Sequence, residues 1–429
     1  MDLVFRNAMI VDPDAGTVER GSLVVQDGLV AGRDERDATA SEIIECDGHC
    51  LAPGIVDLGV KIGEPGERHK ESFRTAGMAA AAGGITTIVT RPDTVPPIDN
   101  PETLEFFIRR AEASTDVRIR PMATLTKGRH GEEISEIGLL SDAGAVAFSD
   151  CDRPVRNARV MSRCMTYAGQ QGALVVGHPQ DPDLSRGAAA TASQFAFLKG
   201  LPTVPTMAER MGLERDLALV ELTGASYHAD QVTTAAALPV LERALEAGLD
   251  VTAGTSIHHL TLNELDIGDY RTFFKVKPPL RSEDDREAIV AGLASGVISI
   301  ISSMHTPQDE ESKRLPFVQA ARGAVALETI LPAALRLYHS GELDLPSLFR
   351  ALSLNPSRRL SLPGGRVSNG APADLVLFDP DFPFRLDRFT LRSKSRNTPF
   401  DNQTLQGRVL RTYVSGKEIF RHSRKEVVA

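Results

Sequence analysis

The sequence predicts an α/β protein in which a closed (β/α)8 TIM-type barrel carries a small β-sandwich built from both chain ends. In the middle of the chain, short β-branched or apolar runs alternate with longer helical stretches, which is typical of parallel strands joined by helices. Both ends consist instead of short strand-like runs and tight turns. We therefore expect a discontinuous β domain, residues 1–52 plus 366–429, and a barrel over residues 53–365.

The two ends share one pattern of alternating apolar residues separated by turns. LVFRNAMIV and SLVVQDGLVAG alternate in this way near the start, and Gln26-Asp27-Gly28 supplies a tight turn. Near the other end, Ala373–Asp379 predicts a strand, and a second strand pair follows with a turn at Ser415-Gly416. These runs predict one small sheet assembled from both termini.

The middle of the chain holds eight strand-like runs in series. They begin at Ile55, Ile85, Val117, Ala145, Ala173, Ala225, Leu249 and Val297. Helical segments such as Leu238–Gly248 and Arg286–Gly296 lie between them, and both end in glycine, a common helix stop. Eight such units favour a closed barrel, whose chemistry belongs at the C-terminal ends of its strands.

Composition narrows the classes of partner. The 429 residues carry a net charge of −9 with no basic blocks, so neither nucleic acid nor an anionic membrane is an expected partner. No targeting segment is recognisable at the start, and no apolar run reaches the length of a bilayer span. The four cysteines contain no C-x-x-C pair, which favours a reduced, cytoplasmic setting.

The motif after the first barrel strand is the most informative one. The run Pro53–Gly66 resembles the dihydroorotase signature, in which a proline-glycine strand ends in His-x-His and is followed by Leu-Arg-Glu-Pro-Gly. Asp57 and the run Glu64-Pro65-Gly66 align with the corresponding residues of that signature. Its two ligand histidines fall on Gly59 and Lys61, however, and its substrate-binding arginine falls on Gly63.

The resemblance extends over almost the whole chain, in the family's order. Further matching segments are Gly83–Asp99, Phe148–Val155, Gly177–Asp181, Ser226–Thr234, Lys275–Glu287, Ser302–Lys313 and the closing strand Ala371–Asp379. On these segments the chain is identified as a member of the dihydroorotase family of the amidohydrolase superfamily. Several positions of the family's motifs are changed: Asp93 and Lys277 stand for asparagines, Cys151 for a bridging carboxylate, Gln231 and Gln308 for histidines, and Met304 for the catalytic aspartate.

The resemblance implies a zinc centre at positions 59, 61, 151, 178, 231 and 304. Only His178 and Cys151 offer good zinc donors there, and a catalytic zinc needs three protein ligands. We therefore expect no cofactor, or zinc only if the site is remodelled around these two residues and an aspartate such as Asp150. The favoured interpretation of His178 is a hydrogen-bonded core or rim residue, and that of Cys151 is an inert buried thiol.

The family's proton shuttle and carboxylate clamp are replaced as well. Met304 has no titratable group, so no catalytic residue is assigned. The remaining pocket positions are Lys61, Asp93, Asn263, Lys277 and His305. Of these, His305 is predicted to be the most exposed and to be able to act as a general acid or base. Lys61 is interpreted either as an ammonium that neutralises nearby aspartates in place of a metal, or as a solvated side chain.

Three functions remain open. The resemblance is strongest to family members that lost catalysis and act as structural partners of aspartate carbamoyltransferase in de novo pyrimidine (UMP) biosynthesis, in a homo- or hetero-oligomer. The alternative is an active dihydroorotase, a cyclic amidohydrolase that interconverts dihydroorotate and N-carbamoyl-aspartate at a remodelled metal site. A third is a binding protein for a dihydroorotate-like ligand. The polar segment Arg388–Asn402 is expected to form a loop on the barrel or on a partner.

Overall fold

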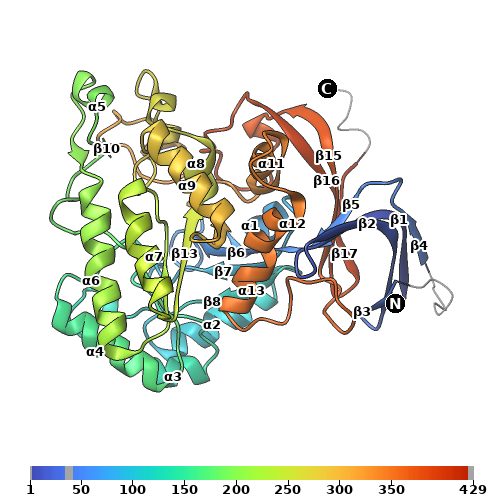
Figure 1. Ribbon diagram of the computed structural model, residues 1–429, viewed down its shortest axis with the longest axis horizontal. Helices are drawn as coiled ribbons and strands as arrows, with labels where there is room; N and C mark the ends of the chain where they lie inside the picture. The colour runs from blue at the N-terminus through green and yellow to red at the C-terminus, as the bar shows by residue number, and fades with distance from the viewer. Residues whose placement is uncertain (1, 34–41, 424–429) are drawn as a thin grey trace.

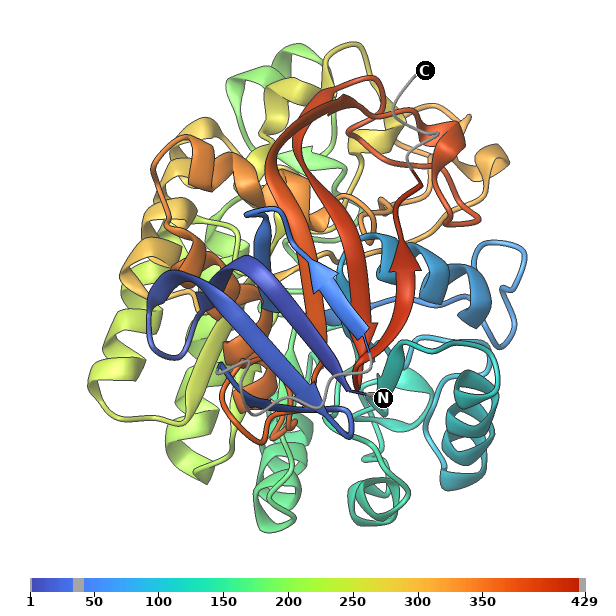
Figure 2. The ribbon, with the colours of Figure 1, turned by 90° about the vertical axis from the view of Figure 1, so that its right-hand side faces the viewer.

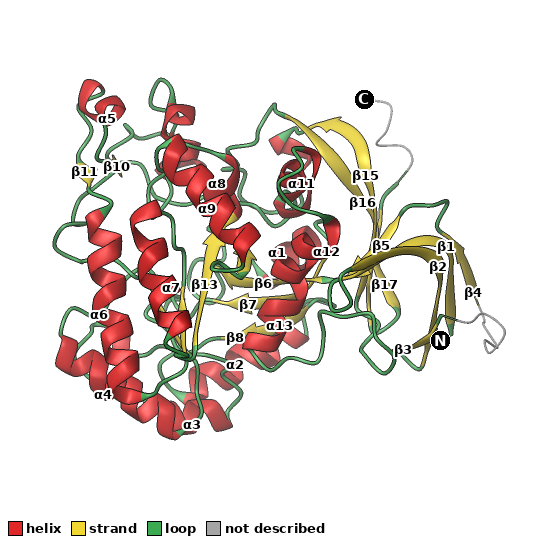
Figure 3. Cartoon of the chain, viewed as in Figure 1, coloured by secondary structure: helices red, strands yellow, loops and turns green. Residues whose placement is uncertain are grey.

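The computed structural model describes residues 2–33 and 42–423, and its larger part is a ring of parallel strands enclosed by helices (Figures 1 and 3). One ladder runs in the order β6-β7-β8 and a second in the order β9-β12-β13-β14. The bounds are β6 Ile55–Val60, β7 Ile85–Thr90, β8 Arg118–Pro121, β9 Val175–Gly177, β12 Tyr227–Ala229, β13 Val251–Ser256 and β14 Ile300–Ser302. The barrel predicted from the eight apolar runs is thus the observed fold.

Two junctions connect these ladders into a ring. Phe148, in the fourth predicted run, bridges Ala123 on one side and Val175 on the other, so this run takes the place of a strand although it is too irregular to form one. At the other junction, the Lys61 N–H donates to the His305 carbonyl at 2.9 Å. The buried Asp57 carboxylate also accepts the Ser303 N–H at 2.8 Å.

Helices cover the outside of the ring. The longer ones are α1 Phe73–Ala82, α2 Pro101–Glu112, α3 Ile137–Asp142, α4 Ala158–Gln170, α6 Met207–Thr223, α7 Leu238–Glu246, α9 Glu283–Ser295 and α11 Ile330–His339; the shorter ones are α5 Gln194–Leu198, α8 Ile257–Thr261, α10 Glu310–Lys313, α12 Leu345–Phe349 and α13 Asn355–Arg359. The predicted helix at 286–296 begins earlier, because the Ser282 hydroxyl accepts the Asp285 N–H and caps it. It ends as predicted, at Gly296 with φ 86°.

Both chain ends build one sheet, as predicted. Its order is β17-β16-β15-β5-β1-β2-β3, with β4 paired to β1. The bounds are β1 Leu3–Asp12, β2 Thr17–Gln26, β3 Leu29–Gly32, β4 Glu42–Glu45, β5 Cys50–Pro53, β15 Leu375–Arg385, β16 Thr404–Val414 and β17 Lys417–Arg421. The two ends meet where β5 pairs antiparallel with β15, and the sheet lies across one end of the barrel (Figure 2). Residues 1, 34–41 and 424–429 of the predicted β domain lie outside the described residues.

The β domain has a core of its own and is also joined to the barrel. Phe5 and Tyr413 meet edge to face, with ring centroids 5.0 Å apart, inside a buried cluster drawn from both chain ends. The other face of β15 joins the main core, where Phe378 packs against Phe349. The four cysteines are buried free thiols. Within residues 2–33 and 42–423, no helix is both long and apolar enough to cross a membrane.

A fully buried ion pair connects helix α6 to the segment that precedes α9. Arg281 and Glu209 approach to 3.3 Å, and their side chains are 2% and 0% exposed. The Glu209 carboxylate also accepts the N–H groups of Thr233 and Thr234 at 2.7 and 2.8 Å. Arg281 donates to the hydroxyls of Thr233 and Thr191 as well. Every charged group in this pair therefore has partners, which is the condition for a tolerable buried charge.

Candidate functional site

A group of seven charged side chains occupies the mouth of the barrel, at the C-terminal ends of its first strands. This mouth cluster consists of Lys61, Glu67, Arg91, Asp93, Arg129, Asp152 and Lys277. Lys61 directly follows β6 and Arg91 directly follows β7, so the parallel strands place both cations at the same edge of the ring.

The first half of the mouth cluster is centred on Lys61. Its ammonium lies 3.0 Å from a Glu67 oxygen and 3.3 Å from an Asp93 oxygen. Asp93 is buried and is also bound by Arg91 at 2.9 Å. Burial raises the pKa of Asp93, but Arg91 and Lys61 outweigh that effect and hold the pKa below its usual range. Of the two interpretations of Lys61, the ammonium that neutralises Asp93 is the observed one; its partners do not include Asp150 or Asp57 among the described ion pairs.

The second half of the mouth cluster is centred on Asp152. Its carboxylate lies 2.7 Å from Arg129, 3.3 Å from Lys277 and 3.9 Å from Arg91. Burial raises the pKa of Asp152, but Lys277 and the two arginines outweigh burial and lower it strongly. Arg91 lies between Asp93 and Asp152 and therefore links the two halves. The mouth of the barrel thus holds a continuous network of opposite charges.

A glycine and a methionine fill the adjoining space, where the resemblance implies a metal. Gly59 lies within β6 at φ 90°, a conformation that favours glycine. A Cβ atom on Gly59 would lie only 2.6 Å from the Met304 sulfur. The thioether therefore occupies the volume that a side chain at position 59 would need.

The two candidate zinc donors are both buried. His178 and Cys151 line one small cavity together with Asp150. Burial, with a further contribution from Lys277, lowers the pKa of His178 to about 3, so the ring is neutral, and its Nε2 has no hydrogen-bond partner among the described residues. Burial, and then Asp93, raises the pKa of the Cys151 thiol to about 12. Asp150 is held by the N–H groups of Leu125 and Thr126, both at 3.0 Å.

These residues do not fit a catalytic zinc. Of the six implied ligand positions, only Cys151 and His178 carry good zinc donors, one fewer than a catalytic zinc needs. Lys61 is a paired ammonium, Gly59 has no donor, and Met304 is a thioether. Among the described residues, no group of three or more His, Cys, Asp or Glu side chains is arranged to hold a metal ion.

Two of the predicted pocket residues lie elsewhere. His305 is fully buried, contrary to the expectation of exposure: its Nε2 lies 3.4 Å from a buried Glu71 oxygen, and its Nδ1 accepts the Ala326 N–H at 3.2 Å. Asn263 caps a 3-10 turn, Glu264–Ile267, and donates to Glu283 at 2.7 Å. Both side chains thus serve local structure. Lys61, Asp93 and Lys277, in contrast, belong to the mouth cluster.

The segment Arg388–Asn402 packs on the barrel, one of its two predicted places. The Ser393 hydroxyl donates to Glu71, the partner of His305. The Asn397 amide donates to the carbonyls of Thr306 and Gly323, at 3.2 and 3.0 Å, beside the loop that follows β14. This segment therefore covers the part of the barrel that carries His305.

Sequence reasoning did not single out Arg91, Glu67, Arg129 or Asp152. Arg91 directly follows a predicted strand, and Asp152 lies within a quoted motif, so the strand-end rule alone could have found both. Arg129 lies in the long loop after β8, and nothing in the local sequence marks it.

Comparisons with known proteins agree with this architecture. The same fold occurs in solved structures: an L-hydantoinase from Arthrobacter aurescens superposes with a TM-score of 0.89 at 24% identity, covering 98% of this chain and 96% of that one. A dihydropyrimidinase from Brevibacillus agri gives 0.85 at 21% identity, with 98% and 95% covered. At these identities the likeness shows the fold alone.

The sequence comparisons are more specific. A family model described as dihydro-orotase-like matches residues 48–236. The dihydroorotase of Desulforapulum autotrophicum is 39% identical over 97% of this chain and 98% of its own, and that of Anaplasma phagocytophilum is 37% identical over 98% and 95%. The chain belongs to the dihydroorotase family.

The role of Lys61 in the mouth cluster predicts a measurable loss of stability. In a Lys61→Met variant, Asp93 keeps Arg91 as its cation and Glu67 keeps Lys70. We therefore expect the free energy of unfolding to fall by about 1–2 kcal/mol, which is less than the cost of leaving a buried charge without any partner. Urea denaturation measures it. Lys70→Met is the matched control, because Glu67 is the one acidic partner of Lys70 among the ion pairs of residues 2–33 and 42–423. An equal effect of both substitutions would contradict a specific role for the Lys61–Asp93 pair.

Proposed function

We propose that this chain is a dihydroorotase-family protein of pyrimidine biosynthesis that has lost hydrolysis and serves as a structural partner of aspartate carbamoyltransferase in the cytoplasm. The single observation that most directly supports the loss of hydrolysis is that the Met304 sulfur lies against Gly59. Gly59, at a position where the family has a ligand histidine, has no side chain. The thioether of Met304, at the position of the catalytic aspartate, fills the space that a side chain on residue 59 would occupy.

The chemistry of ring opening supports the same proposal. Hydrolysis of a cyclic amide requires an activated water and a group that takes up its proton. Met304 takes up no proton, and the Lys61 ammonium, bound to two carboxylates, is not free to do so. His305 faces Glu71 in the interior. Each of the three carboxylates in the mouth cluster is paired with at least one cation, so these acidic groups are balanced without a metal ion.

The decisive experiment combines metal analysis with an activity assay. Purified protein is analysed for bound zinc and is assayed for dihydroorotate opening and carbamoyl-aspartate closure, with and without added zinc. We expect well under one zinc per chain and no turnover, while the Anaplasma relative, assayed in parallel, serves as the positive control. Stoichiometric zinc together with turnover would establish the alternative, an active enzyme with a remodelled site. Calorimetry with dihydroorotate tests the binding-protein alternative in the same preparation.

The partner is supported by the family resemblance, and its test is separate. We expect the chain to co-elute with aspartate carbamoyltransferase from the same organism on size-exclusion chromatography when the two are mixed. Separate elution at micromolar concentrations would overturn the proposed partnership. It would not bear on the proposal that hydrolysis has been lost.

A further inference from the structure

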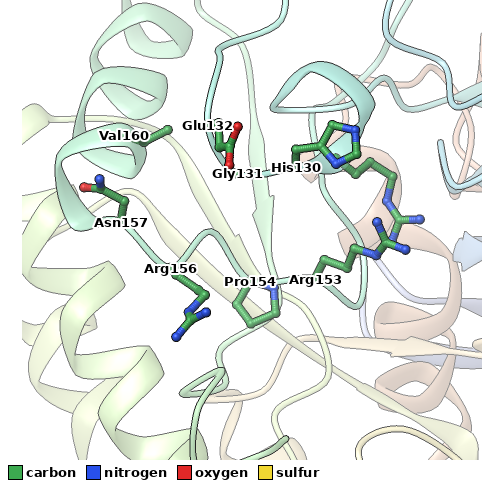
Figure 4. A pocket seen from close by; sticks show the side chains of 9 residues that line it. His130, Gly131, Glu132, Arg153, Pro154, Arg156, Asn157 and Val160 are labelled. Carbon is green, nitrogen blue, oxygen red and sulfur yellow. The ribbon is translucent and has the colours of Figure 1, made fainter.

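A large cavity lies beside the barrel mouth and shares Arg129 with the mouth cluster. Its volume is about 700 Å³, within the range of cavities that bind small metabolites. Two loops form its walls, one after β8 and one that leads into α4 (Figure 4). Its lining residues are Arg129, His130, Gly131, Glu132, Arg153, Pro154, Arg156, Asn157 and Val160.

The lining is rich in positive charge, although the whole chain carries −9. Three guanidinium groups stand against one carboxylate, that of Glu132. Arg129 is bound to Asp152 and Arg156 to Asp183, at 2.7 Å in each case. The Arg153 side chain has no acceptor within residues 2–33 and 42–423, so its charge is available to a ligand.

A helix terminus adds to the positive field. Helix α4 spans 13 residues, and its N-cap, Asn157, lies in the cavity wall. The N-terminus of a helix of this length attracts anions through its free N–H groups and its dipole. Figure 4 shows Asn157 and Arg153 on opposite sides of the cavity, with Arg156 between them. A ligand in the cavity would therefore meet positive potential from several directions.

The walls are fixed by hydrogen bonds. The Arg153 N–H donates to the Asp150 carbonyl at 3.2 Å, and Arg215 donates to the Val155 carbonyl at 2.8 Å. On the opposite loop, the Gly131 N–H donates to the Thr126 hydroxyl at 2.9 Å. Fixed walls reduce the ordering cost of binding.

We propose that this cavity binds a small multivalent oxyanion, such as a phosphate ester or a polycarboxylate, with Arg153 as its principal ligand. Guanidinium groups bind both kinds of anion through paired, charge-assisted hydrogen bonds. Arg129 belongs both to this cavity and to the mouth cluster, so the bound anion competes with Asp152 for it.

Calorimetric titration of the full chain with pyrophosphate and with citrate at low salt tests the proposal. We expect one saturable site per chain for at least one of the two probes. Binding of pyrophosphate alone identifies phosphate-bearing molecules as the ligand class, binding of citrate alone identifies polycarboxylates, and binding of both supports the shared oxyanion chemistry.

Two matched variants locate the site. Arg153→Gln should weaken binding by about tenfold or more, because a charge-assisted hydrogen-bond pair is lost. Arg163→Gln, on helix α4 but outside the cavity lining, should change it by less than about twofold, because this guanidinium does not line the cavity. Thermal melts verify that both variants fold. Absence of saturable binding for both probes, or equal weakening by both substitutions, would overturn the proposal.

Discussion

Replacing Gly59 by alanine should destabilise the protein by about 2–6 kcal/mol. Residue 59 has a φ of 90°, which costs a non-glycine residue about 1–3 kcal/mol. The new Cβ would also lie 2.6 Å from the Met304 sulfur, and overpacking of this kind costs about 1–3 kcal/mol more. Urea denaturation of the single variant measures the sum.

A double-mutant cycle separates the two causes. Met304→Ala alone should cost about 2–3 kcal/mol through the cavity that it leaves. Because the smaller residue makes room for the Cβ atom, the double variant should be more stable than additivity predicts, by about 1–3 kcal/mol. Strict additivity would show that Gly59 and Met304 do not compete for the same space. The same geometry predicts that Gly59→His, which restores a family ligand, is more destabilising than Gly59→Ala.

Replacing Arg281 by methionine should have a comparable effect. The substitution leaves the Glu209 carboxylate fully buried without its cation, and breaking such a pair costs about 3–5 kcal/mol. The hydrogen bonds from Thr233 and Thr234 remain and keep the loss near the lower end of this range. Denaturant midpoints at neutral pH measure the change.

The matched control lies on the same helix as Glu209. Arg210→Met breaks an exposed i,i+4 pair with Glu214 and should cost less than about 1 kcal/mol. Adding Glu209→Gln to Arg281→Met removes the buried charge and should recover part of the loss. If Arg281→Met proves no worse than Arg210→Met, the buried pair contributes little to stability.

The fold was predictable because its signals are local. Eight apolar runs gave the ring, and the turn residues at Gly28 and Gly416 gave the two-ended sheet. The fourth run was predicted as a strand but forms only the bridges through Phe148. Apolar periodicity does not report where a backbone departs from regular pairing.

The site was predictable only in part. The strand-end rule placed Lys61 and Asp93 together, and one of the two interpretations of Lys61 matched its geometry. The partners of Lys277 and the burial of His305 depend on loops and on the segment from 388 to 402, which are distant in sequence. Side-chain pairs between such segments leave no local pattern, so sequence reasoning did not reach them.

The pairing of β5 with β15 has a consequence for the order of events during synthesis. Pro53 meets Leu375 in that ladder, so the first strands leave the ribosome about 320 residues before their partner. At roughly 5–20 residues per second, this delay lasts from about 15 s to about a minute. Throughout it, one edge of β5 is an open template for other chains. Nascent chains of this protein should therefore depend on chaperones until β15 emerges.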